Sequence, residues 1–181
     1  MEYIQSIDNS VLDFIRTHMS SGFLDHTMPF ITRLGSGGMI WIAVTLAFLI
    51  SRKYRTDGLL LASSLLFCLL IGNIILKPLV ARIRPCDVNT AVALLIPRPT
   101  DFSFPSGHSM SSFAATTVIF HANRKMGIAA LILAILIAFS RLYLYVHYPS
   151  DIIAGLVIGI LISVAAIRTY QVKIKGDKSL F

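Results

Sequence analysis

The chain has 181 residues, of which 55% are hydrophobic and only 14% are charged, and its mean hydropathy is +0.75. Soluble domains carry roughly 25% charged residues, so the composition excludes an ordinary soluble domain and predicts one integral membrane domain comprising residues 1–181. The net charge of +7 does not indicate a nucleic-acid partner, because the cations lie at the ends of apolar runs, where membrane topology and anionic lipid head groups explain them.

Residues 1–33 are predicted to form short helices at the membrane surface. The first of these helices carries apolar residues at helical spacing, namely Ile4, Ile7, Val11, Phe14 and Ile15. Its other faces are too polar to cross a bilayer, so an interfacial helix is expected. A second segment, residues 23–34, is interrupted by Pro29, and its sequence does not decide whether it enters the membrane.

Five longer apolar runs follow and predict an all-α bundle of five to six membrane helices within residues 34–170. These runs are residues 34–51, 58–76, 109–120, 126–146 and 152–167. Crossing the hydrocarbon core takes about 20 residues, so the 109–120 run needs residues 104–108 as its outer end. Its many small residues are typical of a helix that packs closely among others.

The basic residues between the runs predict how the bundle is oriented. Basic clusters at residues 52–55 and 124–125 share one side with the tail at residues 171–181. By the positive-inside rule this side is cytoplasmic. The loops at residues 77–108 and 140–151 then face outward, and topology does not explain the cations that they contain.

The segment 140–151 carries Arg141, His147 and Asp151 between two apolar runs. Charged groups at the edge of a membrane are costly unless they are paired or used. If a helix begins near residue 150, Asp151 is close enough to hold one ring nitrogen of His147 and to leave the other nitrogen free to react. The alternative is a topology anchor, in which a juxtamembrane arginine is combined with a capping aspartate.

A second group of cations lies in residues 77–85. Lys77 and Arg84 are seven residues apart, which is two helical turns, so on a continuous helix both face the same way. An ammonium and a guanidinium together suit a tetrahedral oxyanion; the alternative is a basic membrane flank that binds lipid head groups. Arg82 faces elsewhere on such a helix, and both Arg82 and Arg98 are interpreted as flank residues.

The stretch 104–109, Phe-Pro-Ser-Gly-His-Ser, is typical of the start of a helix. Free backbone amides at a helix start can hold an anion, and His108 then lies beside that anion. The alternative is an ordinary capped helix with a solvated histidine. A metal site formed by His108, His147 and Asp151 is not favoured, because the neighbouring cations would repel a divalent ion, so neither a metal nor a cofactor is predicted.

Together, these three stretches resemble the signature of the type 2 phosphatidic acid phosphatase superfamily of membrane lipid phosphatases, to which vanadium haloperoxidases and glucose-6-phosphatase are related. The signature reads Lys-x6-Arg-Pro, then Pro-Ser-Gly-His, then Ser-Arg-x5-His-x3-Asp. Residues 77–85, 105–108 and 140–151 match it at every position and spacing. The resemblance covers about residues 20–170; many members have six membrane helices, whereas the first helix here looks interfacial.

The resemblance implies a role for each signature residue. Five of them are implied to hold the phosphoryl oxygens: Lys77, Arg84, Ser106, Gly107 and Arg141. His147 is implied to attack phosphorus and form a phosphohistidine, with Asp151 orienting its ring and His108 protonating the leaving oxygen. Three fixed cations can stabilise the charge that Mg²⁺ stabilises elsewhere, so a metal-independent phosphatase is expected.

A site at the membrane–water boundary favours a lipid substrate whose phosphate emerges from the bilayer. The candidates implied by the resemblance are undecaprenyl diphosphate, phosphatidylglycerol phosphate, phosphatidic acid and the phosphates of lipid A. An outward-facing site in a bacterial plasma membrane favours undecaprenyl diphosphate, and no obligatory protein partner is predicted. Two alternatives from other classes stay open: a lipid or anion transporter that uses the cations as a relay, and a catalytically silent scaffold that binds lipid head groups.

Overall fold

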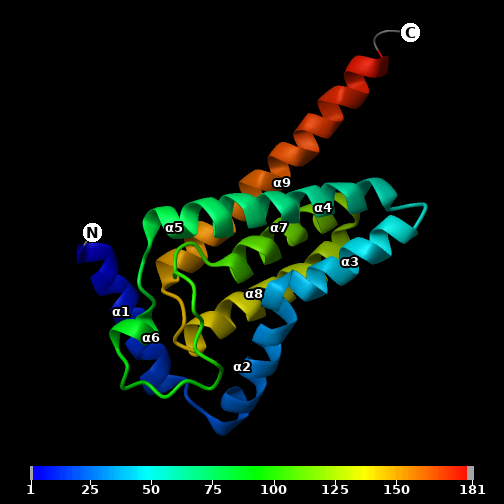
Figure 1. Ribbon diagram of the computed structural model, residues 1–181. Helices are drawn as coiled ribbons and strands as arrows, with labels where there is room; N and C mark the ends of the chain where they lie inside the picture. Colours follow the sequence, from blue (N-terminus) through cyan, green and yellow to red (C-terminus); the bar gives the residue numbers. More distant parts are fainter. Residues whose placement is uncertain (1, 179–181) are drawn as a thin grey trace.

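The computed structural model describes residues 2–178, and every regular element among them is helical, which confirms the predicted all-α class. Figure 1 shows these elements in chain order. Their bounds are α1 Glu2–His18, α2 Gly22–Gly35, η1 Ser36–Gly38, α3 Met39–Ile50, α4 Arg55–Cys68, η2 Leu69–Leu76, α5 Lys77–Val80, α6 Pro85–Val88, α7 Gly107–Ala122, α8 Arg124–Tyr143 and α9 Pro149–Lys178. The segment η1 is a 3₁₀-helix and η2 is a π-helix that joins α4 to α5 without a break.

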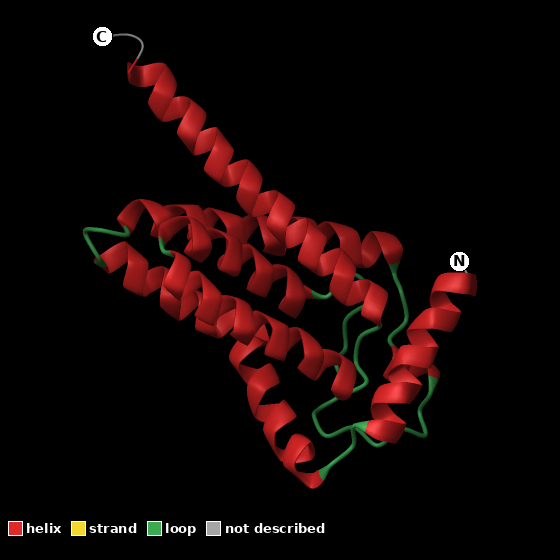
Figure 2. Cartoon of the chain, turned by 180° about the vertical axis from the view of Figure 1, so that it is seen from behind, coloured by secondary structure: helices red, strands yellow, loops and turns green. Residues whose placement is uncertain are grey.

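Helix α7 lies at the centre of the bundle, where it packs against α4, α8 and α9 (Figures 1 and 2). The small residues that it buries include Ser109, Ser112, Ala114, Ala115 and Thr116. Glycines on α9 bring the two backbones together, because a Cβ at Gly159 would come within 2.3 Å of the Met110 carbonyl oxygen. Small residues on both helices therefore allow the close approach that the sequence predicted for this segment.

Four segments are long and apolar enough to cross a membrane, which agrees with an integral membrane protein. These segments are Gly22–Ile50, Arg55–Val88, Arg124–Tyr143 and Pro149–Lys173. Helix α7 has only 16 residues and is shorter than any of them, although it lies inside the bundle. Residues 2–173 thus provide four segments of this kind and do not confirm the predicted five to six.

The second N-terminal segment continues into the first long apolar run. Pro29 lies inside α2, and α2 leads through η1 into α3, so that both helices belong to one apolar segment of 29 residues. Gly37 and Gly38 form the turn between them with φ angles of 58° and 71°, which side chains with a Cβ rarely adopt. Helix α1 packs across the end of the bundle through Leu12 and Ile15 (Figure 1), and its place at the membrane surface stays a prediction.

The chain from Lys77 to Arg84 does not form one continuous helix. Helix α5 ends at Val80, and Ala81 adopts a left-handed conformation with a φ of 48°. This conformation costs an L-residue about 1–2 kcal/mol, and it turns the chain out of the helix. Tyr145, between α8 and α9, also has a positive φ of 59°. Both strained positions lie within three residues of a signature residue, and such strain is common at functional sites.

The two ends of the bundle carry different features. Helices α1 and α6 and the loops at residues 89–106 and 144–148 gather at one end (Figure 1). At the other end, His121 of α7 contacts Asp57 of α4 at 3.1 Å and Gln171 of α9 at 3.4 Å. The basic clusters beside these residues therefore lie far from the signature loops. Helix α9 includes most of the predicted tail, and residues 179–181 lie outside the described residues.

Candidate active site

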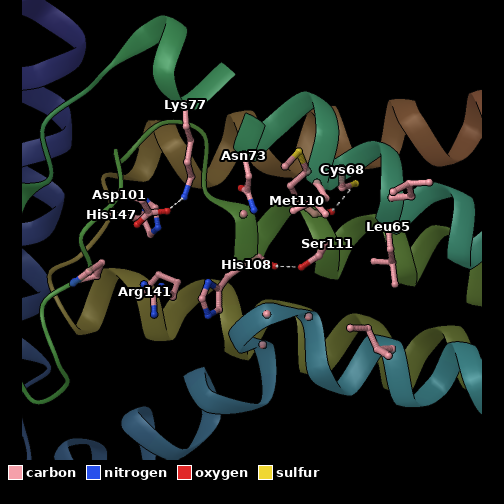
Figure 3. A pocket seen from close by; sticks show the side chains of 18 of the residues that line it. Leu65, Cys68, Asn73, Lys77, Asp101, His108, Met110, Ser111, Arg141 and His147 are labelled. Carbon is pink, nitrogen blue, oxygen red and sulfur yellow. Dashed lines mark hydrogen bonds and ion pairs between the residues drawn. The ribbon is translucent and has the colours of Figure 1, made fainter. Parts of the chain in front are cut away.

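The signature residues meet around a cavity of about 470 Å³ at the end of the bundle that carries the long loop (Figure 3). Six of the eight predicted site residues line it: Lys77, Arg84, Gly107, His108, Arg141 and His147. The other two, Ser106 and Asp151, are fully buried behind the lining residues. Segments far apart in the sequence are thus brought to one place, while the chemical role of each residue stays a prediction.

Two of the cations share the carboxylate of Asp101, a residue of the 89–106 loop. Lys77 Nζ donates to Oδ2 of this carboxylate, and Arg84 Nη2 donates to Oδ1 at 2.6 Å. Arg84 is fixed further by the carbonyl oxygens of Asp101 and Val146, at 2.7 and 2.5 Å. Asp101 therefore stands in front of the two cations, where an incoming oxyanion would bind them (Figure 3).

Arg141 has no carboxylate partner among the side chains of residues 2–173. Its Nη1 donates to Thr32 Oγ1 at 2.7 Å, and its Nε has no hydrogen-bond partner. The residue is only 5% exposed. Burying an unpaired charge is costly, so the position of Arg141 at the cavity wall favours an anionic ligand that comes from outside.

His147 lies between Arg84 and Asp151. Arg84 Nη1 is 3.0 Å from His147 Nε2, and because a guanidinium can only donate, Nε2 is the unprotonated ring nitrogen. Nδ1 then carries the proton and faces Asp151 Oδ2 at 3.5 Å. Burial, opposed by Asp151 and reinforced by the charges of Arg84 and Arg141, lowers the pKa of His147 to about 3. The imidazole is therefore neutral near pH 7, as a nitrogen nucleophile must be.

Asp151, in the first turn of α9, is held by three donors besides His147. Its Oδ2 accepts from Ser103 Oγ at 2.5 Å and from the Tyr148 amide at 2.9 Å. Its Oδ1 accepts from Arg82 Nη1 at 2.7 Å. These bonds fix the orientation of a fully buried carboxylate, and through it the tautomer of His147.

The start of α7 forms the wall of the cavity opposite Lys77. Ser106 caps this helix, since its Oγ accepts from the Ser109 amide at 3.4 Å and its own amide donates to the Asp151 carbonyl at 3.1 Å. Its hydroxyl faces the helix start instead of the cavity. Gly107 borders the cavity, and a Cβ there would lie 2.9 Å from Asn73 Oδ1, so a larger residue would displace the Asn73 side chain.

His108 approaches the cavity from the side of the α2–α3 junction. Its Nε2 lies 3.5 Å from Ser36 Oγ, and a Cβ at Gly35 would come within 2.9 Å of the ring. The absence of a side chain at Gly35 thus allows the ring to lie between α2 and the cavity. His108, in the first turn of α7, and His147, in the loop between α8 and α9, line the same cavity (Figure 3).

The cavity continues from the cations to the outer surface of the bundle. Its apolar part is lined by Ile42, Leu65, Leu66 and Leu69. Ile42, Leu66 and Leu69 are also 48–53% exposed on the outside of the protein. The surface of a membrane bundle faces acyl chains, so the cavity offers a polar end for a phosphate and an apolar end open to lipid.

Sequence reasoning missed or misjudged four residues near the site. Asn73 lies on the π-helix and lines the cavity. A polar amide within an apolar run could have identified it, and π-helical turns are frequent at functional sites. Asp101 and Ser103 lie in a polar loop and belong to no motif, so the sequence did not single them out. Arg82 was interpreted as a membrane flank residue, and this was wrong: its side chain is only 19% exposed and forms ion pairs with Asp8 and Asp151.

Known proteins resemble this chain in sequence and in structure. A family model described as the PAP2 superfamily matches residues 57–175. The undecaprenyl-diphosphatase of Sulfolobus acidocaldarius is 35% identical over 146 residues, which cover 80% of this chain and 70% of the relative. The lipid A 4'-phosphatase of Bacteroides thetaiotaomicron is 29% identical over 173 residues, covering 88% and 75%. The crystal structure of a PAP2 type phosphatidylglycerolphosphate phosphatase from Bacillus subtilis matches with a TM-score of 0.78 and 26% identity, over 96% of this chain and 89% of that chain.

Proposed function

Because the chain belongs to the PAP2 superfamily and is a membrane lipid phosphatase, we propose that it hydrolyses undecaprenyl diphosphate through a phosphohistidine intermediate, without a metal, at the outer face of the membrane. The substrate is supported by the similarity to an undecaprenyl-diphosphatase over most of both chains. The relatives that act on other lipid phosphates make the substrate the part of this proposal that most needs an experiment.

The net positive charge of the cavity is the main observation that supports the proposal. Three cations, Lys77, Arg84 and Arg141, and one carboxylate, Asp101, line it, which leaves two positive charges in excess. A phosphoryl group with two negative charges balances this excess. Charged hydrogen-bond donors fixed in a site that excludes water are also what stabilises the equatorial oxygens during phosphoryl transfer.

The first chemical step uses the lone pair on His147 Nε2. When the phosphoryl group displaces Asp101, Arg84 can donate to a phosphoryl oxygen and release Nε2, to which it now donates at 3.0 Å. Nε2 then forms a bond to phosphorus while the bond from phosphorus to the leaving oxygen breaks. The ring gains positive charge in this step, and the Asp151 carboxylate beside Nδ1, at 3.5 Å, stabilises it.

His108 completes both steps by moving one proton. In its imidazolium form it gives a proton to the leaving oxygen, so that the lipid departs as a monophosphate when the substrate is a diphosphate. A water molecule then attacks phosphorus and gives a proton back to His108. The bond between phosphorus and His147 Nε2 breaks, which releases inorganic phosphate and returns the His147 imidazole to its neutral form.

The apolar end of the cavity supports a lipid over a soluble phosphate ester. An acyl or polyprenyl chain attached to the phosphate can leave the cavity past Ile42, Leu66 and Leu69, which line it and are exposed on the surface of the bundle. The chain can then stay in the bilayer while the phosphate lies between the cations. The basic clusters lie at the opposite end, which supports an outward-facing site by the positive-inside rule.

A substrate panel tests this proposal. Phosphate release by the purified protein in mixed micelles is measured with undecaprenyl diphosphate, phosphatidylglycerol phosphate, phosphatidic acid and a lipid A phosphate, with His147→Ala as the background. We expect the highest kcat/KM on undecaprenyl diphosphate. An equal or higher kcat/KM on another lipid would reject this substrate, and release from none of the four would reject the proposed function.

A further inference from the structure

Arg82 connects the N-terminal helix to the buried aspartate of the site. Its Nη1 donates to Asp151 Oδ1 and to Ser150 Oγ, both at 2.7 Å. Its Nη2 donates to Asp8 Oδ2 at 2.7 Å and to Gln5 Oε1 at 2.8 Å. One guanidinium thus bridges α1 and the first turn of α9, and its planar fork is suited to two such pairs at once.

The other side of this bridge is equally well ordered. Asp8 is only 1% exposed and accepts from the Ser150 amide at 2.9 Å and from Ser150 Oγ at 2.5 Å. The guanidinium of Arg82 also lies over the Tyr148 ring, 4.0 Å from its centroid, which is a favourable cation–π distance. Asp8 therefore holds Arg82 in the one position from which it reaches Asp151.

Asp151 depends on Arg82 for the contact of one of its two carboxylate oxygens. Its Oδ2 is occupied by Ser103, the Tyr148 amide and the facing His147 ring, whereas Oδ1 accepts a side-chain bond only from Arg82 among residues 2–173. A buried carboxylate without a cation tends to take up a proton or turn away. Either change would remove the acceptor that fixes the Nδ1 proton of His147.

We infer that Arg82 is a positioning residue for the hydrolysis, which acts through Asp151 on His147, and that Asp8 of α1 holds Arg82 in place. This inference rests on the proposed function. Arg82 does not line the cavity, so it does not bind the substrate. Helix α1 is then part of the catalytic apparatus, although it contributes no residue to the cavity.

The test separates positioning from stability. Arg82→Gln, Arg82→Lys and Asp8→Asn are compared with Arg98→Gln, a matched control that loses its bonds to the Asp87 side chain and the Cys86 carbonyl of α6. With a lipid phosphate that the wild type hydrolyses, we expect kcat per folded protein to fall about 10- to 100-fold in Arg82→Gln, as is typical when the support of a site residue is removed. KM should stay within about twofold, Arg82→Lys should recover part of kcat, and Arg98→Gln should resemble the wild type.

A cycle of variants shows whether Asp8 and Arg82 act as one unit. If Asp8 acts through Arg82, Asp8→Asn combined with Arg82→Gln should lower kcat no further than Arg82→Gln alone. If Arg82→Gln does not fold, Arg82→Lys and the isosteric Asp8→Asn decide the question. A kcat within twofold of wild type in all the variants that fold, or a rise in KM alone, would overturn the inference. His147→Ala separates the two proposals: if it stays active, the proposed function fails; if it is inactive while Arg82→Gln is fully active, only the positioning role fails.

Discussion

Replacing Asp101 by asparagine tests whether its carboxylate competes with the substrate for the cations. Asp101 bridges Lys77 and Arg84 in front of the cavity, so a phosphoryl group has to displace it before it can bind both. Asp101→Asn keeps the shape of the side chain and removes its charge. We therefore expect the variant to bind inorganic phosphate more tightly than the wild type, and the structure sets the size of the effect.

Burial by itself raises the pKa of Asp101, but hydrogen bonds and charge from Lys77 and Arg84 outweigh it and lower the pKa to about 2, from an ordinary value of 3.8. A lowering of this size corresponds to about 2.5 kcal/mol of favourable interaction for the carboxylate. The side chain is 52% exposed, so solvent screening reduces the figure to about 1 kcal/mol. Releasing the carboxylate should therefore cost roughly fivefold in phosphate affinity.

The assay is inhibition by inorganic phosphate, measured as Ki in the wild type, in Asp101→Asn and in a matched control, Asp87→Asn. Asp87, in α6, pairs at 2.8 Å with Arg98 of the 89–106 loop and does not line the cavity. We expect Ki to be about fivefold lower in Asp101→Asn than in the wild type. This ratio should be the same at every pH from about 5 to about 9, because the wild-type carboxylate stays ionised down to about pH 2. An unchanged or higher Ki would refute the reasoning, since Asp101 would then support the bound state.

Further predictions concern the nucleophile, the metal, stability and orientation. His147→Ala should abolish phosphate release and His108→Ala should lower kcat by at least about 10²-fold; full activity in either variant would reject its assigned role. Activity should persist in EDTA, and complete loss there would favour a metal mechanism. The pKa of His147 is lowered to about 3 by burial. Below about pH 6.5 the unfolded chain therefore takes up a proton at this residue that the folded protein does not. The stability of the folded protein is unaffected by this residue's titration above about pH 6.5 and is lowered by it as the pH falls towards about 3. In detergent, the melting temperature of His147→Gln should depend less on pH over this range than that of the wild type. Equal slopes of melting temperature against pH would contradict this. In intact cells, a membrane-impermeant maleimide should label Leu95→Cys, whereas Lys53→Cys should need permeabilisation; the reverse pattern would overturn the outward orientation.

The sequence predicted which signature residues meet because fixed short spacings carry local geometry. Asp151 lies four residues after His147, and this spacing alone brought the carboxylate close to the ring, where the structure has it at 3.5 Å. The match of three ordered motifs then indicated the phosphatase superfamily, which the comparisons confirm. Lys77 and Arg84 both line the cavity although the chain between them is not one continuous helix, because Ala81 adopts a conformation that its sequence does not signal.

Contacts between distant segments could not be predicted in this way. Asp101 reaches Lys77 across 24 residues, and Asp8 reaches Ser150 across 142, so no local pattern links the partners. Arg82 was misjudged for the same reason, since its acceptors come from α1 and α9. The number of spans was also difficult to predict, because α7 is enclosed by other helices and can be shorter than a helix that faces lipid on its own.

The stereochemical course at phosphorus tests the phosphohistidine intermediate most directly. A lipid substrate whose terminal phosphoryl group is made chiral with oxygen isotopes and sulfur is hydrolysed in isotopically labelled water, and the configuration of the released thiophosphate is determined. Attack by His147 followed by attack of water comprises two in-line displacements, each of which inverts phosphorus, so we expect overall retention. Overall inversion would mean that water attacks the substrate directly, and His147 could not be the nucleophile.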